Sequence, residues 1–323
     1  MNERVAKLRE QSLETVPSIS PERALLLTEF YRTTPPDTCS TAVHRALAFK
    51  YLLEHKEICI NPGELIVGER GPAPKATPTY PELCCHSLED LDLLNAREKI
   101  PFRVSPQVRD IFAREIIPYW QGRTMREQIF AAMTPEWKGC YHSGIFTEFM
   151  EQRAPGHTVA DDKIYRKGFL DFQKEIAASR AALDWGNDPR AWDKGEQLRA
   201  MEICCQAIIA YARRHAGRAR ELAQLEPDPL RREELKQVAL VCEHVPAHAP
   251  RTFWEALQAY WFIHLGVITE LNTWDSFNPG HLDQHLWPFY QRELAQGTLN
   301  RERAKELLQC FWVKFNNQIG RAH

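Results

Sequence analysis

The sequence has no excess of either charge, and this absence excludes one large class of partners. Its 323 residues include 41 Lys and Arg against 43 Asp and Glu, for a formal net charge of −2. A protein that binds the phosphate backbone needs a basic excess to displace counterions. We therefore expect no nucleic acid partner.

Long apolar runs are also missing. The most apolar stretch, residues 256–268, is interrupted by Gln258 and His264, and it is shorter than the ~18 apolar residues that a membrane span requires. Residues 1–14 are charged throughout and lack the apolar centre of a secretory signal. These absences predict a cytoplasmic protein with no membrane partner.

Generic catalytic and metal-binding motifs are absent too. Glycine is scarce, at 15 residues, and there is no Gly-rich phosphate loop, nucleophile elbow or H-E-x-x-H motif. The nine cysteines are odd in number and lack C-x-x-C spacing, which predicts reduced thiols. His281 and His285 are four residues apart, but without the usual glutamate they favour a cap or a surface polar contact over a metal site. We expect no metal and no bound cofactor.

What the sequence does contain is mostly helical pattern. Ser20 and Pro21 predict a capped helix over residues 21–31, and apolar spacing predicts further helices over 41–54, 88–97, 106–120, 124–133 and several stretches of 162–251. Residues 252–265 are apolar nearly all round and predict a buried helix. Asn300 caps a final helix over residues 301–316, whose aromatic stripe predicts that its covering layer is missing or is supplied by another subunit.

One region predicts β structure. Residues 57–69 form two short β-favouring runs around an Asn61-Pro62-Gly63 turn, which is typical of a hairpin. The fold class expected for the chain remains mainly α.

Two segments are harder to explain as scaffold. Residues 148–157 combine aromatic and ionisable side chains at a Pro-Gly turn, and turns held by rigid elements often carry sites. In residues 269–280, Asp275 lies between Trp274 and Phe277. A carboxylate among aromatic rings must be paired or have its pKa raised, as acid–base chemistry requires.

Five strings resemble a known family. They are TPTYPELCCHSLEDL (77–91), MTPEW (133–137), GIFTEFMEQRAPGHTV (144–159), VPAHAPRTFWEALQAYWFIHLGVITELNTWDSFNPGHLDQHL (245–286) and LLQCFWVKFNNQ (307–318). They resemble the pyruvate formate-lyase type of glycyl radical enzymes, and within it the trans-4-hydroxy-L-proline dehydratases.

The resemblance implies the N-terminal part of a ten-stranded β/α barrel, in which outer helices dominate. Family members are more than twice as long as this chain. We therefore expect residues 1–323 to be the N-terminal portion of a single pyruvate formate-lyase domain. The catalytic cysteine region and the C-terminal glycyl radical domain are then absent, and the isolated chain is expected to be inactive.

The activity that the resemblance implies is radical dehydration of trans-4-hydroxy-L-proline to pyrroline-5-carboxylate. A glycyl radical, installed by a separate radical S-adenosylmethionine activase, passes to a cysteine that takes a hydrogen from the ring carbon next to nitrogen. Loss of the hydroxyl as water requires an acid near the leaving oxygen and a dry interior. The resemblance also implies that the full-length protein is a homodimer.

By their motifs, Phe149, His157 and Asp275 are expected to line the substrate cavity, with Asp275 as the catalytic residue. His157 hydrogen-bonds the hydroxyl or the carboxylate of the substrate, and Asp275 pairs with the ring ammonium or assists proton movement. The structural alternatives are a satisfied core histidine for His157 and a loop cap for Asp275.

Two other functions remain open from the sequence. The same fold serves other glycyl radical reactions: diol dehydration, C–N cleavage and formate acetyl transfer. A different class is a non-catalytic helical module that binds a partner through the apolar face of its last helix.

Overall fold

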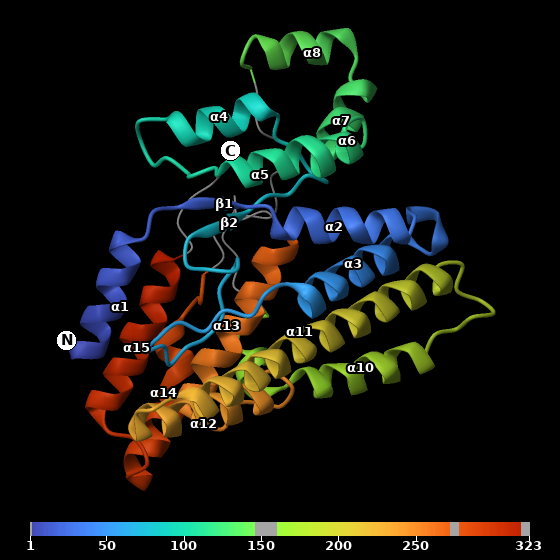
Figure 1. Cartoon of the computed structure of the whole chain (residues 1–323). Helices are drawn as coiled ribbons and strands as arrows, with labels where there is room; N and C mark the ends of the chain where they lie inside the picture. The colour runs from blue at the N-terminus through green and yellow to red at the C-terminus, as the bar shows by residue number, and fades with distance from the viewer. Residues whose placement is uncertain (1, 146–159, 272–277, 318–323) are drawn as a thin grey trace.

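The computed structural model describes residues 2–145, 160–271 and 278–317, and nearly all of its regular structure is helical. The helices form a larger and a smaller group on either side of a small sheet (Figure 1). The prediction of a mainly α fold is confirmed for the described part of the chain.

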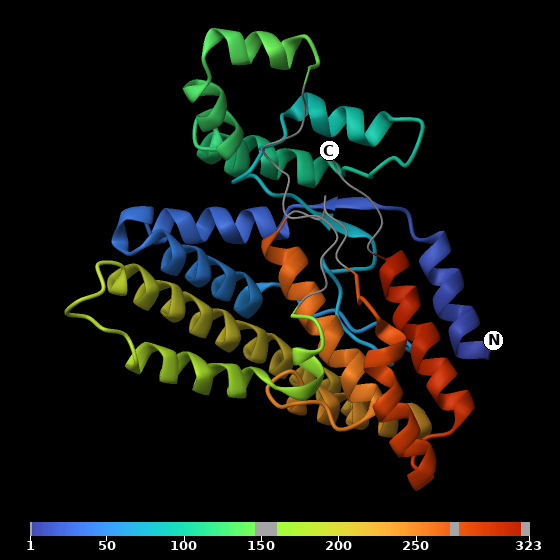
Figure 2. The same cartoon turned by 180° about the vertical axis from the view of Figure 1, so that it is seen from behind.

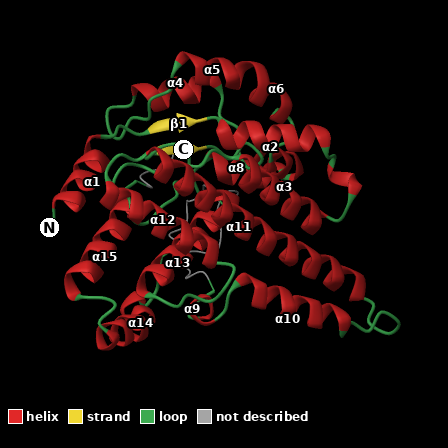
Figure 3. Ribbon diagram, turned by 60° about the horizontal axis from the view of Figure 1, so that its bottom comes forward, coloured by secondary structure: helices red, strands yellow, loops and turns green. Residues whose placement is uncertain are grey.

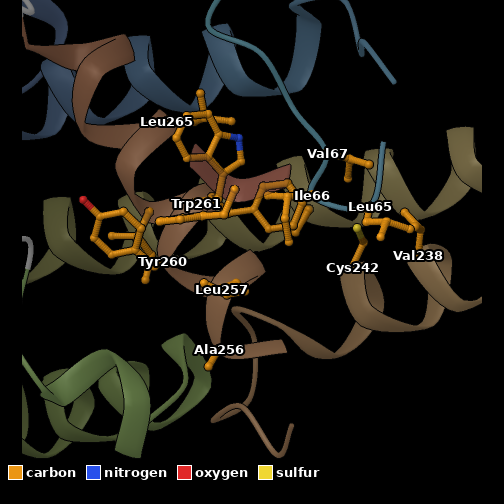
Figure 4. Close-up of a cluster of buried hydrophobic side chains, with 14 of the residues drawn as sticks. Leu65, Ile66, Val67, Val238, Cys242, Ala256, Leu257, Tyr260, Trp261 and Leu265 are labelled. Atoms are coloured by element: carbon orange, nitrogen blue, oxygen red, sulfur yellow. The ribbon is translucent and has the colours of Figure 1, made fainter. Parts of the chain in front are cut away.

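Helix α13 (Phe253–Glu270) is the centre of the larger group. Against it pack α15 (Arg301–Asn316) on one side, α3 (Thr41–His55) and α11 (Ala191–Leu225) on the other, and α12 (Pro229–His244) and α14 (Leu282–Gln296) near its first turns (Figures 1 and 2). Two outer helices complete the group: α1 (Glu3–Glu14) packs on α15, and α10 (Phe169–Ala181) packs on α11. Leu257, Tyr260 and Trp261 of α13 are fully buried, in the core that Figure 4 shows. The predicted all-round burial of this helix is confirmed.

The smaller group packs on α2 (Glu22–Thr33). Phe112 and Ile116 are fully buried in this contact, and the indole of Trp120 donates a 2.8 Å hydrogen bond to the hydroxyl of Thr28. The group consists of α4 (Leu88–Ala96), α5 (Pro106–Ile111), a π-helical turn (Phe112–Ile116), α6 (Ile117–Trp120), α7 (Met125–Ala132) and α8 (Pro135–His142) (Figures 1 and 3). Two further short elements are a 3-10 turn (Pro36–Thr38) and α9 (Lys163–Arg166).

The sheet between the two groups has two parallel strands, β1 (Ser18–Ser20) and β2 (Ala76–Pro78). Ile19 pairs with Thr77. The backbone amide of Ile19 also donates a 2.9 Å hydrogen bond to the carbonyl of Arg103, which ties a third segment to the sheet. Because Ser20 belongs to β1, the next helix begins one residue later than predicted, at Glu22, and Ser20 is not its cap residue.

Most predicted helix boundaries are confirmed to within a few residues because local caps set them. Ser40 and Ser105 accept hydrogen bonds from the backbone amides three residues ahead, at the starts of α3 and α5. Asn300 does the same for α15, which spans the predicted residues. Such side-chain caps satisfy amides that the helix itself leaves without partners.

The hairpin predicted over residues 57–69 is wrong, since no strand lies in this described segment. Its buried residues Leu65, Ile66 and Val67 lie against α13. Side chains of α13 take the place of a partner strand: Gln258 bonds both the amide and the carbonyl of Val67, at 2.9 and 3.0 Å. The indoles of Trp254 and Trp261 donate to the carbonyls of Leu65 and Gly68, each at 2.9 Å. The apolar run is therefore core, and its backbone is satisfied without a sheet.

The last helix does have a cover, contrary to the expectation of a missing layer. Leu307 and Phe311 of α15 are buried because α1, from the other end of the chain, packs along them together with α13. Arg4 of α1 contacts Glu306 at 2.9 Å, and Ser12 donates to Asn317 at 2.6 Å. Trp312 remains half exposed.

None of the nine cysteines, all of which lie in the described ranges, forms a disulfide. The described helices include none that is long and apolar enough to cross a membrane.

Two buried histidines make the stability of the fold depend on pH. His215 and His264 are enclosed in the core, and burial lowers their pKa to about 3 and about 4. Both are therefore neutral in the fold, whereas they titrate near pH 6.5 when unfolded. Their stabilising contribution is present above pH 6.5 and is lost as the pH falls toward the folded-state values.

We expect urea unfolding at pH 6 and pH 5 to show a loss of about 1.4 kcal/mol per pH unit for each of these histidines. A His264→Gln variant is expected to lose one histidine's share of the slope, and His142→Gln, at an exposed position on α8, to keep the full slope. A free energy of unfolding that stays flat between these pH values contradicts this prediction.

Candidate functional site at the end of α13

The three residues predicted to line the substrate cavity lie outside the described residues: Phe149 and His157 fall within 146–159, and Asp275 falls within 272–277. What the structure describes is the chain on either side of them. Ala160 follows the first segment, and Leu271 precedes the second at the end of α13.

These two flanking residues line one cavity. It has a volume of about 960 Å³ and lies between α3, α10, α11 and the second half of α13. Its walls are mainly apolar, with Phe49, Phe172 and Ile263 among them. The segments that carry His157 and Asp275 thus join the described chain at the wall of the same cavity.

Two charged groups of this cavity, Arg45 and Glu270, lie near the end of α13. Arg45 of α3 donates from Nε to the carboxylate of Glu270 at 3.1 Å, with a second contact from its terminal nitrogen. Burial raises the pKa of Glu270, although Arg45 and Arg23 oppose that shift. The carboxylate of Glu270 is thus paired with Arg45 and lies beside the apolar walls of the cavity.

The last turn of α13 is held by donors from outside the helix. The hydroxyl of Tyr80 donates to the carbonyl of Ile268, and Nε of Arg23 donates to the carbonyl of Thr269 at 2.7 Å. Carbonyls in the last turn of a helix have no partner within it. The backbone amide of Leu271 closes the turn by donating to Val267 at 2.8 Å.

Arg23 is itself fixed on several sides. Its guanidinium donates two bonds to the carboxylate of Glu82, at 3.1 and 2.5 Å, and one to the carbonyl of Thr79 at 3.1 Å. The same group lies 4.0 Å from the centre of the Tyr80 ring. Burial alone works against the charge of Arg23, but the carboxylate of Glu82 raises its pKa, so Arg23 stays protonated.

Sequence reasoning did not identify Arg23, Tyr80 or Glu82 as a set. The available signal was a charged residue on an apolar face, because Arg23 is next to buried Ala24 and one turn before buried Leu27. Tyr80 and Glu82 lie in one of the strings that carry the family resemblance, but their spacing does not indicate that Tyr80 contacts a residue 188 positions later in the chain.

The two histidines of the H-x-x-x-H pattern have different surroundings. His281 precedes α14 without capping it, and His285 stacks on Tyr165 with ring centres 5.0 Å apart. Asp161 lies 3.7 Å from the imidazole of His285. Among the residues that the structure describes, no three of His, Cys, Asp and Glu come together as metal ligands.

Comparison with known proteins places this geometry in a family. The family model "Pyruvate formate lyase-like" matches residues 1–320. The chain belongs to the pyruvate formate lyase-like family.

Within the family, the chain is 52% identical to trans-4-hydroxy-L-proline dehydratase of Clostridioides difficile over 98% of its length. The crystal structure of that dehydratase with trans-4-hydroxy-L-proline bound superposes with a TM-score of 0.94 over 98% of this chain and 40% of the other. A glycyl radical enzyme from Archaeoglobus fulgidus, 31% identical, superposes with a TM-score of 0.87 over 98% of this chain and 40% of its own.

A relative whose name gives a different activity, isethionate sulfite-lyase of Nitratidesulfovibrio vulgaris, is 33% identical over 97% of this chain and 39% of its own length. In both comparisons the chain spans only part of the relative, and it covers about 40% of the length of the curated dehydratase.

Proposed function

We propose that this chain supplies one portion of a longer pyruvate formate lyase-like domain, whose reaction is the dehydration of trans-4-hydroxy-L-proline to pyrroline-5-carboxylate. One observation carries the proposal: the likeness to a dehydratase with that substrate bound, at 52% identity and a TM-score of 0.94. The competing proposal is the activity that the name of the 33% identical relative gives, the release of sulfite from isethionate.

The radical chemistry belongs to the part of the domain that this chain does not cover. In the proposed enzyme, a glycyl radical installed by a radical S-adenosylmethionine activase supplies, through a cysteine, the hydrogen abstraction that starts the reaction. A homodimer in the cytoplasm is part of the proposal, and nine cysteines without disulfides fit a reducing compartment.

The residues of this chain then bind and orient the substrate. Phe149 packs against the ring, while His157 and Asp275 share the polar contacts to the hydroxyl, the carboxylate and the ring ammonium. Removing the hydroxyl as water needs a proton donor at the leaving oxygen, and Asp275 is assigned to that proton movement. Support comes from Ala160 and Leu271, which flank the two segments and line one apolar cavity.

A chimera tests the proposal. Residues 1–317 of this chain replace the matching portion of the Clostridioides difficile dehydratase, and the purified protein is activated anaerobically with that enzyme's activase. We expect pyrroline-5-carboxylate to form from trans-4-hydroxy-L-proline, and no sulfite to form from isethionate.

Radical content, measured by electron paramagnetic resonance, distinguishes a failure of activation from a failure of specificity. An activated chimera that carries the radical but releases sulfite from isethionate, or leaves hydroxyproline unchanged, rejects the proposed function.

A further inference from the structure

We propose that an amphipathic helix docks in the apolar groove between α3, α10, α11 and α13, and that this helix belongs to the part of the longer domain that this chain does not cover. The groove is the cavity of about 960 Å³ beside the end of α13. The inference rests on the proposed function, in which this chain supplies one portion of that domain.

The cavity is too large for the proposed substrate alone. Its volume of about 960 Å³ is near the upper end of the range of ~300–1,000 Å³ that holds drug-sized ligands. In comparison, trans-4-hydroxy-L-proline is a single small ring with a carboxylate, an ammonium and a hydroxyl. Radical chemistry also requires that water be excluded from the site. Most of this volume must therefore be filled by protein.

The α10 wall of the groove is apolar and only partly covered. Helix α10 packs on α11, which lies between it and α3 (Figures 1 and 2). It contributes Phe169, Phe172 and Ile176 to the lining, and of the α10 residues only Ile176 is buried. Glu175, the charged lining residue of α10, already pairs with Lys167. This wall therefore offers apolar surface rather than charge to an occupant.

The α11 side of the groove is open in the same way. Met201 lines the cavity and is 52% exposed, and the neighbouring lining residues Leu198 and Ala200 are apolar too. Contiguous apolar surface of this kind marks an interaction site, and a methionine side chain adapts its shape to the partner that covers it.

The walls determine which conformation the occupant takes. The described lining residues come almost entirely from helices, whose backbone amides and carbonyls bond to one another. An extended segment would be buried here without hydrogen-bond partners for its own backbone, which is costly. A helix satisfies its own backbone and can lay an apolar face in such a groove. The α10 lining runs from Phe169 to Ser179, about 15 Å along the helix axis, enough for roughly three helical turns.

The rest of the same domain, rather than a second copy of the chain, is the partner that fits. The chain covers about 40% of the length of the dehydratase that it resembles, so more than half of such a domain lies outside it. The groove includes the Arg45–Glu270 pair beside the end of α13, where the proposed substrate cavity has to be closed in every enzyme molecule. A helix from the same domain closes it at any protein concentration.

Hydrogen–deuterium exchange, read by mass spectrometry, compares the isolated chain with the chimera, both without substrate. We expect the amides of α10 to exchange at least about tenfold more slowly in the chimera, because a covered helix opens less often. Met201→Glu is expected to remove most of this protection, since the docked helix would bury an unpaired carboxylate. Met201→Leu, which keeps the apolar surface, is expected to retain the protection.

Leu240→Glu is the matched control for the introduced charge. Leu240 is 57% exposed on α12 and does not line the groove, so this variant is expected to leave the exchange of α10 unchanged in the chimera. Equal exchange of α10 in the chain and the chimera overturns the inference, as does full protection in Met201→Glu.

A second copy as the occupant is a separate outcome. It is identified if protection of α10 in the isolated chain rises with chain concentration, together with the mass measured by light scattering, and this result also overturns the inference. In each of these cases the proposed function stands if the parent chimera forms pyrroline-5-carboxylate. An activated chimera that protects α10 but releases sulfite supports the docked helix and rejects the substrate. Should Met201→Glu fail to fold, the comparison of chain with chimera remains a complete test.

Discussion

Replacing Lys314 by methionine is expected to lower the free energy of unfolding by about 3–5 kcal/mol. Lys314 is 2% exposed, and its ammonium lies 2.6 Å from the carboxylates of both Glu64 and Glu69. Burial opposes the charge of Lys314, but the two carboxylates outweigh it and raise its pKa. Without the ammonium, two carboxylates are left buried with no cation between them.

The loss is a large share of the 5–15 kcal/mol that typically separates folded from unfolded domains. Asn317 also donates to Glu69, at 2.9 Å, so the cluster joins the end of α15 to the loop after α3. The measurement is urea unfolding of the chain followed by circular dichroism.

Lys305→Met is the matched control, since it makes the same substitution at an exposed position of the same helix. It is expected to change stability by less than about 0.5 kcal/mol. Adding Glu69→Gln to Lys314→Met is expected to recover part of the loss by removing one uncompensated charge. Equal stability of the Lys314 and Lys305 variants contradicts the prediction.

The second large effect concerns Asp275. In the activated chimera, Asp275→Asn is expected to lower turnover of trans-4-hydroxy-L-proline at least about 100-fold, because an amide cannot give or take the proton that the leaving hydroxyl requires. The melting curve and the radical content are expected to match those of the parent chimera.

Asp283→Asn makes the same change eight residues later, at an exposed position in the first turn of α14, and is expected to keep full turnover. Near-normal turnover by the Asp275 variant, with the radical present, rejects its assignment as the catalytic residue.

The fold shows how far local patterns reach. Caps at Ser40, Ser105 and Asn300 set helix starts that are correct in the structure, because a cap depends only on residues within one turn. The hairpin over residues 57–69 is wrong for the opposite reason. Its apolar run has the composition of strands, but the partners of its backbone are Gln258, Trp254 and Trp261, about 190 positions away.

The candidate site residues also fall into two sets, those predicted from motifs and those found only from tertiary contacts. Phe149, His157 and Asp275 came from motif resemblance and stay predictions, whereas Arg23 and Tyr80 emerged only from their contacts with the end of α13. A cation on an apolar helix face signals some buried partner, but the sequence does not say which one.

By itself, the sequence determined the family, the mainly helical composition and the burial of α13, since these depend on residue types and on spacing within one element. Only the tertiary structure decided that α1 covers α15, that Lys314 lies between Glu64 and Glu69, and that Arg23 and Tyr80 hold the last turn of α13. These arrangements join residues far apart in the chain. Their partners are chosen by which buried polar groups would otherwise lack a hydrogen bond or a counter-charge, and that is settled only when the elements pack.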